Sequence, residues 1–181
     1  MTADDSTQAA HRAIEAVWRL ESARIIAGLT GLLRDVGLAE ELAQDAMLLG
    51  RVTYEMFAAH WPNQTGDMAD TMNGTPKYVV SGTLESVDWQ NSTLIPAASA
   101  FTEIAELKQQ PGQNIGMTGS GTLVSSLLRE GLLDELHLFV FPLVAGSGKR
   151  LFAAADAQLP LKLLDSATFQ SGVVHLTYAK A

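Results

Sequence analysis

The sequence predicts an α/β fold, with a mostly parallel β-sheet covered by helices on both faces and an antiparallel hairpin near the C-terminus. Three observations support this prediction. From Met47 onward, short apolar runs alternate with segments whose apolar residues recur at helical spacing, as in parallel strands joined by helices. Gly50 and the Gly119–Gly121 turn stand where strand patterns give way to helical ones. Residues 161–169 and 172–179 are strand-like runs with no helix between them, which predicts the hairpin.

The first 46 residues predict a helical segment ahead of this domain. Apolar side chains recur at helical spacing up to a plausible stop at Gly37: Ile14, Trp18, Ile25, Leu29, Leu32 and Val36. Residues 38–46 predict a second short helix. Alternatively, residues 24–33 form a strand, because Gly28 and Gly31 each weaken a helix by about 1 kcal/mol. We therefore expect a helical leader at 1–46 and an α/β domain at 47–181.

Within the α/β domain, each predicted strand except the hairpin runs into a helix or a turn. Helix 50–60 ends at Trp61–Pro62, and the helix that follows Gly121 stops at Gly131. The predicted strands are 47–49, 77–81, 92–95, 115–117 and 134–144, and the other predicted helices are 67–74 and 100–110. A turn is expected at 145–148, and we expect the hairpin to lie at the edge of the sheet.

A glycine-rich turn, Gly119-Ser120-Gly121, provides a candidate anion site. The helix that follows would point free N–H groups, the positive end of its dipole and the hydroxyls of Ser120 and Thr122 at whatever lies above Gly119. This arrangement suits a phosphate. The alternative is that the glycines only make a tight connection between strand and helix.

Two other strand ends carry candidate binding residues. Gly50 precedes a helix whose first turn holds Arg51 and Thr53, a guanidinium and a hydroxyl that could both reach a phosphate. The alternative is a surface arginine and a threonine cap. Ser81 lies at the carboxyl end of its strand, where ligands collect in open α/β sheets, although it could equally be a turn residue.

Composition excludes several function classes. A formal charge of −8 argues against a nucleic-acid or anionic-membrane surface, and no apolar run reaches a membrane-spanning length. Without cysteine there is no disulfide, thiolate metal site or cysteine nucleophile, which fits a reducing compartment, so we expect a cytoplasmic protein. The four histidines lack ligand spacing, so we expect no metal. We interpret His137 and His175 as packed or surface strand residues that could be neighbours across strands. Small molecules are the expected partners.

Residues 15–29 and 34–46 resemble the first helices of an extracytoplasmic-function RNA polymerase sigma factor. The resemblance stops at about Ala46, and nothing downstream resembles the promoter-reading parts of such factors. It implies either a residual polymerase-docking element or a helical leader recruited to cover the next domain.

Residues 46–181 resemble the dihydrofolate-reductase-like family that includes the reductase domain of riboflavin-biosynthesis proteins. The matching segments are 48–55, 76–81, 118–123, 131–138 and 142–152. The resemblance implies an oxidoreductase that binds NADPH across the carboxyl ends of the strands. It assigns the cofactor's phosphates to Gly50, Arg51 and Thr53, with Arg51 near the 2′-phosphate. It assigns the adenosine side to Ser81, and the pyrophosphate to Gly119, Ser120, Gly121, Thr122 and Leu123.

The chain departs from this family at its front end. Members usually begin with a central strand that lines the substrate pocket, and here the sigma-like segment takes its place, which implies a gene fusion. An intact member would pass a hydride to a small heterocyclic substrate, pterin-like or pyrimidine-like. No catalytic residue can be assigned from the sequence. The alternative is a non-catalytic fusion that keeps the fold and uses the leader for dimerisation or partner binding. Members are often dimers, so a homodimer is expected.

Overall fold

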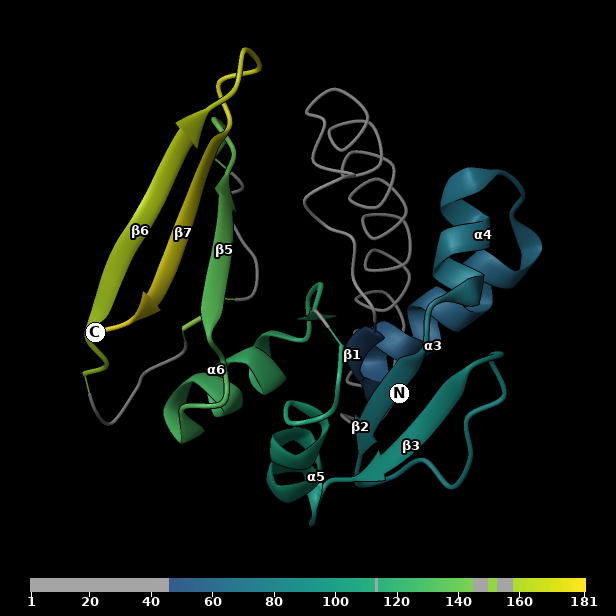
Figure 1. The fold of residues 1–181 in the computed structure, drawn as a ribbon. Helices are drawn as coiled ribbons and strands as arrows, with labels where there is room; N and C mark the ends of the chain where they lie inside the picture. Colours follow the sequence, from purple (N-terminus) through teal and green to yellow (C-terminus); the bar gives the residue numbers. More distant parts are fainter. Residues whose placement is uncertain (1–45, 113, 145–149, 153–157) are drawn as a thin grey trace, which may run out of the picture. The chain divides into compact units, whose positions relative to one another are not determined.

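The computed structural model describes residues 46–112, 114–144, 150–152 and 158–181, all within one compact unit, Gln44–Ala181. Figure 1 shows their arrangement. The helical leader, the alternative strand at 24–33 and the turn at 145–148 lie outside the described residues, so these interpretations and the boundary near residue 46 stay predictions.

A parallel sheet forms the first layer, as the alternating pattern predicted. Its order is β3-β2-β1-β4, and every neighbouring pair runs parallel. The strands are β1 (Ala46–Gly50), β2 (Lys77–Ser81), β3 (Ser92–Pro96) and the two-residue β4 (Ile115–Gly116). From β1 the chain adds β2 and β3 on one side and then β4 on the other, so the direction of strand addition reverses between β1 and β4.

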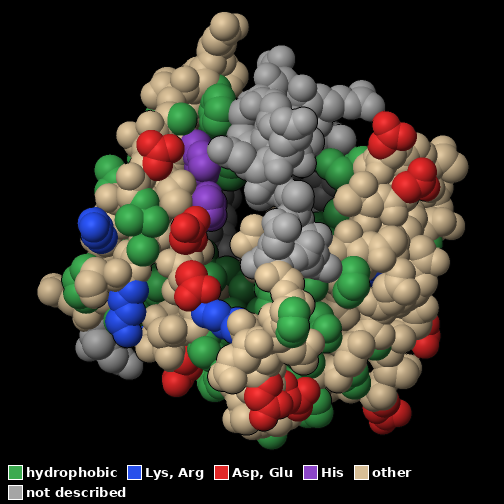
Figure 2. All heavy atoms as spheres, in the orientation of Figure 1, with side chains coloured by type: hydrophobic (Ala, Val, Ile, Leu, Met, Phe, Trp, Pro, Cys, Tyr) green, Lys and Arg blue, Asp and Glu red, His purple; other side chains and the backbone are tan. Residues whose placement is uncertain are grey.

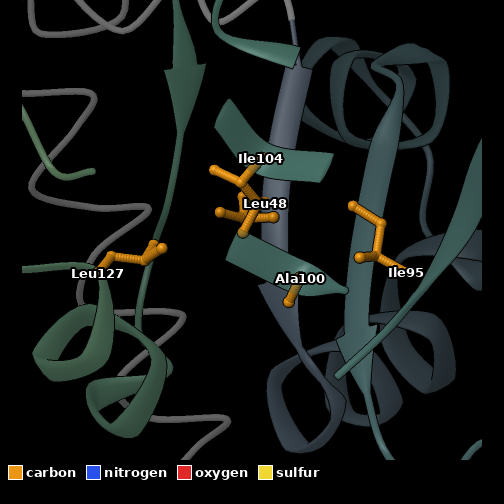
Figure 3. Packing of buried hydrophobic residues seen from close by; sticks show 5 residues of the cluster. All are labelled: Leu48, Ile95, Ala100, Ile104 and Leu127. Carbon is orange, nitrogen blue, oxygen red and sulfur yellow. The ribbon is translucent and has the colours of Figure 1, made fainter. Parts of the chain in front are cut away.

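Helices cover both faces of this sheet. They are α3 (Arg51–His60), α4 (Asp67–Gly74), α5 (Ala100–Leu107) and α6 (Gly121–Glu130), with a 3-10 turn, η1 (Trp61–Asn63), after α3. Leu48 of β1 packs with residues from β3, α5 and α6 in one apolar cluster, completed by Ile95, Ala100, Ile104 and Leu127 (Figure 3). Helix α3 contacts β1 and β2 but contributes nothing to that cluster. Because neighbouring residues of a strand face opposite sides, α3 covers the other face.

A separate antiparallel sheet, β5-β7-β6, contains the predicted hairpin (Figure 1). Its strands are β5 (Glu135–Val140), β6 (Leu161–Thr168) and β7 (Val174–Lys180). The hairpin of β6 and β7 is confirmed, but its expected place at the edge of the parallel sheet is not, because β7 pairs with β5 along that strand's whole length. The predicted strand 134–144 is also too long. The observed strand, β5, ends at Val140, before Pro142, which has no N–H to donate to a ladder.

A buried lysine closes the start of β2. Lys77 is only 1% exposed, and its Nζ donates to the carbonyl oxygens of Asn73 at 3.1 Å and Thr75 at 2.6 Å. The amino group also lies 4.2 Å from the ring centroid of Trp89. Lys77 therefore satisfies carbonyls at the C-terminal end of α4, where the helix leaves them without partners. Burial lowers the pKa of Lys77 from its ordinary 10.5 to about 8.

This lowered pKa predicts that the protein gains stability as the pH rises above 8. Between pH 8 and 10.5 the unfolded chain keeps the Lys77 proton that the folded protein has lost, so the free energy of unfolding rises by about 1.4 kcal/mol per pH unit. Below pH 8 the cost of burying the charge is fully present. Lys77→Met has no titrating group at this position, so its stability lacks this dependence on pH. In urea unfolding at pH 7.5, 8.5 and 9.5, the free energy of unfolding of wild type should therefore rise relative to that of the variant. An equal change with pH in the two proteins would contradict the lowered pKa.

Candidate functional site

The candidate site lies where the order of strand addition reverses, between β1 and β4. These strands are hydrogen-bonded neighbours, with Ala46 opposite Ile115 and Met47 opposite Gly116. Each is followed by a short turn and then a helix, α3 after β1 and α6 after β4. In open α/β sheets the two connections diverge at such a point and leave a crevice beyond the carboxyl ends of the strands, where ligands bind.

The two turns approach each other so closely that one position has no room for a side chain. A Cβ atom on Gly50 would lie 2.7 Å from the Oγ of Ser120, a separation that real side chains do not show. Gly119 is required for a different reason, because its φ of +79° lies in the left-handed region that other residues rarely adopt. A Cβ there would lie 3.6 Å from the Oγ1 of Thr53. The glycines predicted at both turns therefore have a steric or conformational role.

The Ser120 hydroxyl links the two turns. Its Oγ accepts a hydrogen bond from the N–H of Gly50 at 2.8 Å and forms a second hydrogen bond, also 2.8 Å, with the Oγ1 of Thr53. Ser120 itself has φ 58° and ψ 53°, a left-handed conformation that costs a non-glycine residue roughly 1 kcal/mol. Two hydrogen bonds of about 1 kcal/mol each offset that cost.

The helices that begin at these turns lack side-chain caps. Neither the N-cap of α3 nor that of α6 gives its helix a side-chain hydrogen bond, and neither first turn contains an acidic residue. The other two α-helices in the described part of the chain, α4 and α5, also lack a side-chain cap hydrogen bond, but each has acidic side chains in its first turn. An anion between the two turns would therefore meet two sets of backbone N–H groups and the positive ends of two helix dipoles.

Arg51, predicted to reach a phosphate, lies on the surface of α3, directly after Gly50. Its Nη1 pairs with the carboxylate of Glu55 at 2.9 Å, and both side chains are nearly half exposed. Such an i,i+4 pair contributes only about 0.3–0.5 kcal/mol. A charge-assisted hydrogen bond to a phosphate contributes about 1.5–3 kcal/mol. Arg51 can therefore exchange Glu55 for a phosphate with a net gain. Glu55 was missed in the sequence, although its i,i+4 spacing from Arg51 was a usable signal.

The remaining predicted residues are more dispersed. Ser81 acts as the turn residue of the alternative interpretation, since its Oγ accepts from the N–H groups of Thr83 at 3.1 Å and Leu84 at 3.0 Å. Thr122 is exposed, and Leu123 packs against the core cluster. A Cβ on Gly121 would meet Leu151 at 3.7 Å, an ordinary contact. Of the nine predicted residues, the turns bring together Gly50, Thr53, Gly119 and Ser120.

The histidine pair lies in the antiparallel sheet. His137 Nδ1 and His175 Nε2 are 3.0 Å apart, and the Nε2 of His137 is 3.2 Å from the carboxylate of Glu135. Figure 2 shows histidine side chains gathered on this face with acidic side chains beside them. The expectation that the pair are neighbours across strands is confirmed. Among the described residues, no group of three or more histidine, aspartate or glutamate side chains could hold a metal ion. No helix there is long and apolar enough to cross a membrane.

The chain matches a known protein family over most of its length. The family model for the RibD C-terminal domain matches residues 1–175. The chain belongs to the RibD C-terminal domain family. The match begins at residue 1 and so includes the segment that resembles sigma factors. Neither this match nor the relatives named below support that sigma-factor resemblance.

Two curated relatives come from Bacillus subtilis (strain 168). The protein YyaP is 31% identical over 150 residues, which cover 80% of this chain and 79% of YyaP. The protein YwjB is 33% identical over 138 residues, covering 76% of this chain and 74% of YwjB. These identities extend across most of each protein, so the relationship is not limited to the glycine-rich turns.

Solved structures share the fold. A putative riboflavin biosynthesis protein from Shewanella sp. PV-4 has a TM-score of 0.63 at 23% identity, covering 81% of this chain and 78% of that protein. A pyrimidine reductase-like protein from Corynebacterium diphtheriae has a TM-score of 0.52 at 13% identity, with 76% of each chain covered. At these identities the likeness establishes the α/β architecture. Membership in the RibD C-terminal domain family supports a reductase-like role for this chain.

Proposed function

We propose that this protein is an NADPH-dependent reductase that transfers a hydride to a small heterocyclic substrate, pterin-like or pyrimidine-like. The observation that carries the proposal is the meeting of two uncapped helix N-termini at the point between β1 and β4 where ligands bind in open α/β sheets. Family membership supports the oxidoreductase class, and the Corynebacterium neighbour, described as pyrimidine reductase-like, supports the substrate class.

The residues at the two turns fit a dinucleotide. Gly50 and Gly119 add no side chain of their own at the N-termini of α3 and α6, so a pyrophosphate can approach the backbone there closely. The first-turn N–H groups of α3 and α6 would bind that diphosphate, and Arg51 would bind the 2′-phosphate that distinguishes NADPH from NADH. The cofactor supplies the hydride, and the protein supplies binding and orientation. We assign no proton donor.

Calorimetric titration with NADPH and, separately, with NADH tests this function. Wild type is expected to bind NADPH with a micromolar Kd and at least about tenfold more tightly than NADH, since one charged contact is worth about 1.4 kcal/mol or more. Arg51→Ala should lose this preference while keeping its affinity for NADH. Glu55→Gln releases the guanidinium from its partner and should keep or increase the preference.

Arg129→Ala is the matched control, because Arg129 is also an exposed helix arginine but lies in the last turn of α6. It should leave both affinities unchanged. Equal affinities of wild type for NADPH and NADH would refute the role of Arg51. Failure to bind either nucleotide would refute the proposed function and favour a non-catalytic protein that keeps the reductase fold.

A further inference from the structure

One serine joins two turns that are far apart in the sequence. Ser120 belongs to the turn before α6, yet its hydroxyl forms no hydrogen bond with that helix. Both of its hydrogen bonds go instead to the turn after β1, to the N–H of Gly50 and the hydroxyl of Thr53, 70 and 67 positions away. The serine is therefore directed at the neighbouring turn rather than at its own helix.

The two hydroxyls of this pair use part of their hydrogen-bonding capacity within the protein. The Ser120 Oγ accepts from Gly50 and shares one proton with Thr53, whose side chain is buried with 7% exposure. The hydrogen bond between Ser120 and Thr53 uses one of their two hydroxyl protons. Together with the bond to Gly50, it fixes the distance between the two helix N-termini, which a diphosphate must reach together.

We propose that Ser120 is a positioning residue that holds the two turns at the spacing needed by one dinucleotide diphosphate. The proposal rests on the proposed function, and it adds an indirect role to the contact with the cofactor that the sequence predicts for Ser120. The left-handed backbone of Ser120 fits this role, since that conformation directs the hydroxyl toward Gly50. Thr53 is the second residue of this link, through its hydrogen bond to Ser120.

Loss of this link should weaken ligands that span both turns and spare ligands that need only one. Ser120→Ala and Thr53→Val are expected to raise the Kd for NADPH about tenfold, while the Kd for adenosine 2′-phosphate changes less than about twofold. Thr53→Ser keeps the hydroxyl and should bind NADPH like wild type. A general structural defect would weaken both ligands together, and that result would overturn the positioning role.

Hydrogen exchange of the nucleotide-free protein separates this inference from the proposed function. Ser120→Ala should speed exchange of the Gly50 amide, because that amide loses its acceptor. Ser126→Ala is the control, since its hydroxyl bonds to the carbonyl of Thr122 within α6. Faster exchange with unchanged NADPH affinity would overturn the positioning role alone. Absence of nucleotide binding by wild type would overturn the proposed function and the positioning role with it.

Discussion

Gly50→Ala is expected to abolish NADPH binding and to lower the free energy of unfolding by about 1–3 kcal/mol, the usual cost of forcing extra atoms into a packed site. The new methyl group would lie 2.7 Å from the Ser120 Oγ and 3.1 Å from its Cβ. The Ser120 hydroxyl must therefore turn away and lose its hydrogen bonds to Gly50 and Thr53, and the Ser120 Cβ must shift by a few tenths of an ångström. Urea unfolding and calorimetric titration with NADPH measure the two effects.

Gly74→Ala is the matched control, because a Cβ at this position would meet nothing within 4 Å. It should leave both stability and affinity close to those of wild type. The double variant Gly50→Ala/Ser120→Gly removes the clashing side chain and should regain most of the lost stability. If Gly50→Ala alone binds NADPH as wild type does, the diphosphate does not lie between these turns.

Leu127→Ala should cause the largest loss of stability, about 2–5 kcal/mol, because it leaves a cavity in the core. Leu127 is 2% exposed and is the buried residue that α6 contributes to the cluster around Leu48, while the partly buried Leu123 packs against it. Weakening that contact also loosens the helix whose N-terminus faces the candidate site. NADPH affinity should therefore fall together with stability, as measured by urea unfolding and titration of the same samples.

Phe101→Ala provides the comparison, since Phe101 is a large apolar residue of α5 with 41% exposure. Its truncation should cost less than about 1 kcal/mol and leave affinity unchanged. A similar loss in both variants would mean that the core cluster does not hold α6 against the sheet.

Local patterns predicted the parallel sheet well. The buried run around Leu48, the helical spacing of α3 and the stop of α6 at Gly131 are each encoded within about ten residues. Pairings between distant segments were harder. That β5 pairs with β7, rather than leaving a hairpin at the edge of the parallel sheet, depends on a ladder between segments about 40 positions apart. Periodicity within one strand carries no information about its partner.

In the candidate site, too, local features could be predicted from the sequence and contacts between distant segments could not. Gly50, Thr53, Gly119 and Ser120 were all predicted, because glycine turns between strands and helices have a recognisable pattern. The contact between Ser120 and Gly50 could not be predicted, since only the β1–β4 pairing brings the two turns together. Ser81 illustrates the opposite case. Its position at a strand end suggested a ligand, but its hydroxyl accepts the nearest backbone N–H groups, as serine commonly does in turns.

The link between Gly50 and Ser120 also has a consequence for synthesis on the ribosome. Gly50 is made 70 residues before Ser120. At about 5–20 residues per second, roughly 4 to 14 seconds separate them. By the end of that interval β1, β2 and β3 have all been translated, but until then the second turn of the site does not exist. A nascent chain that ends before residue 120 therefore contains β1, β2 and β3 but only one of the two turns of the candidate site.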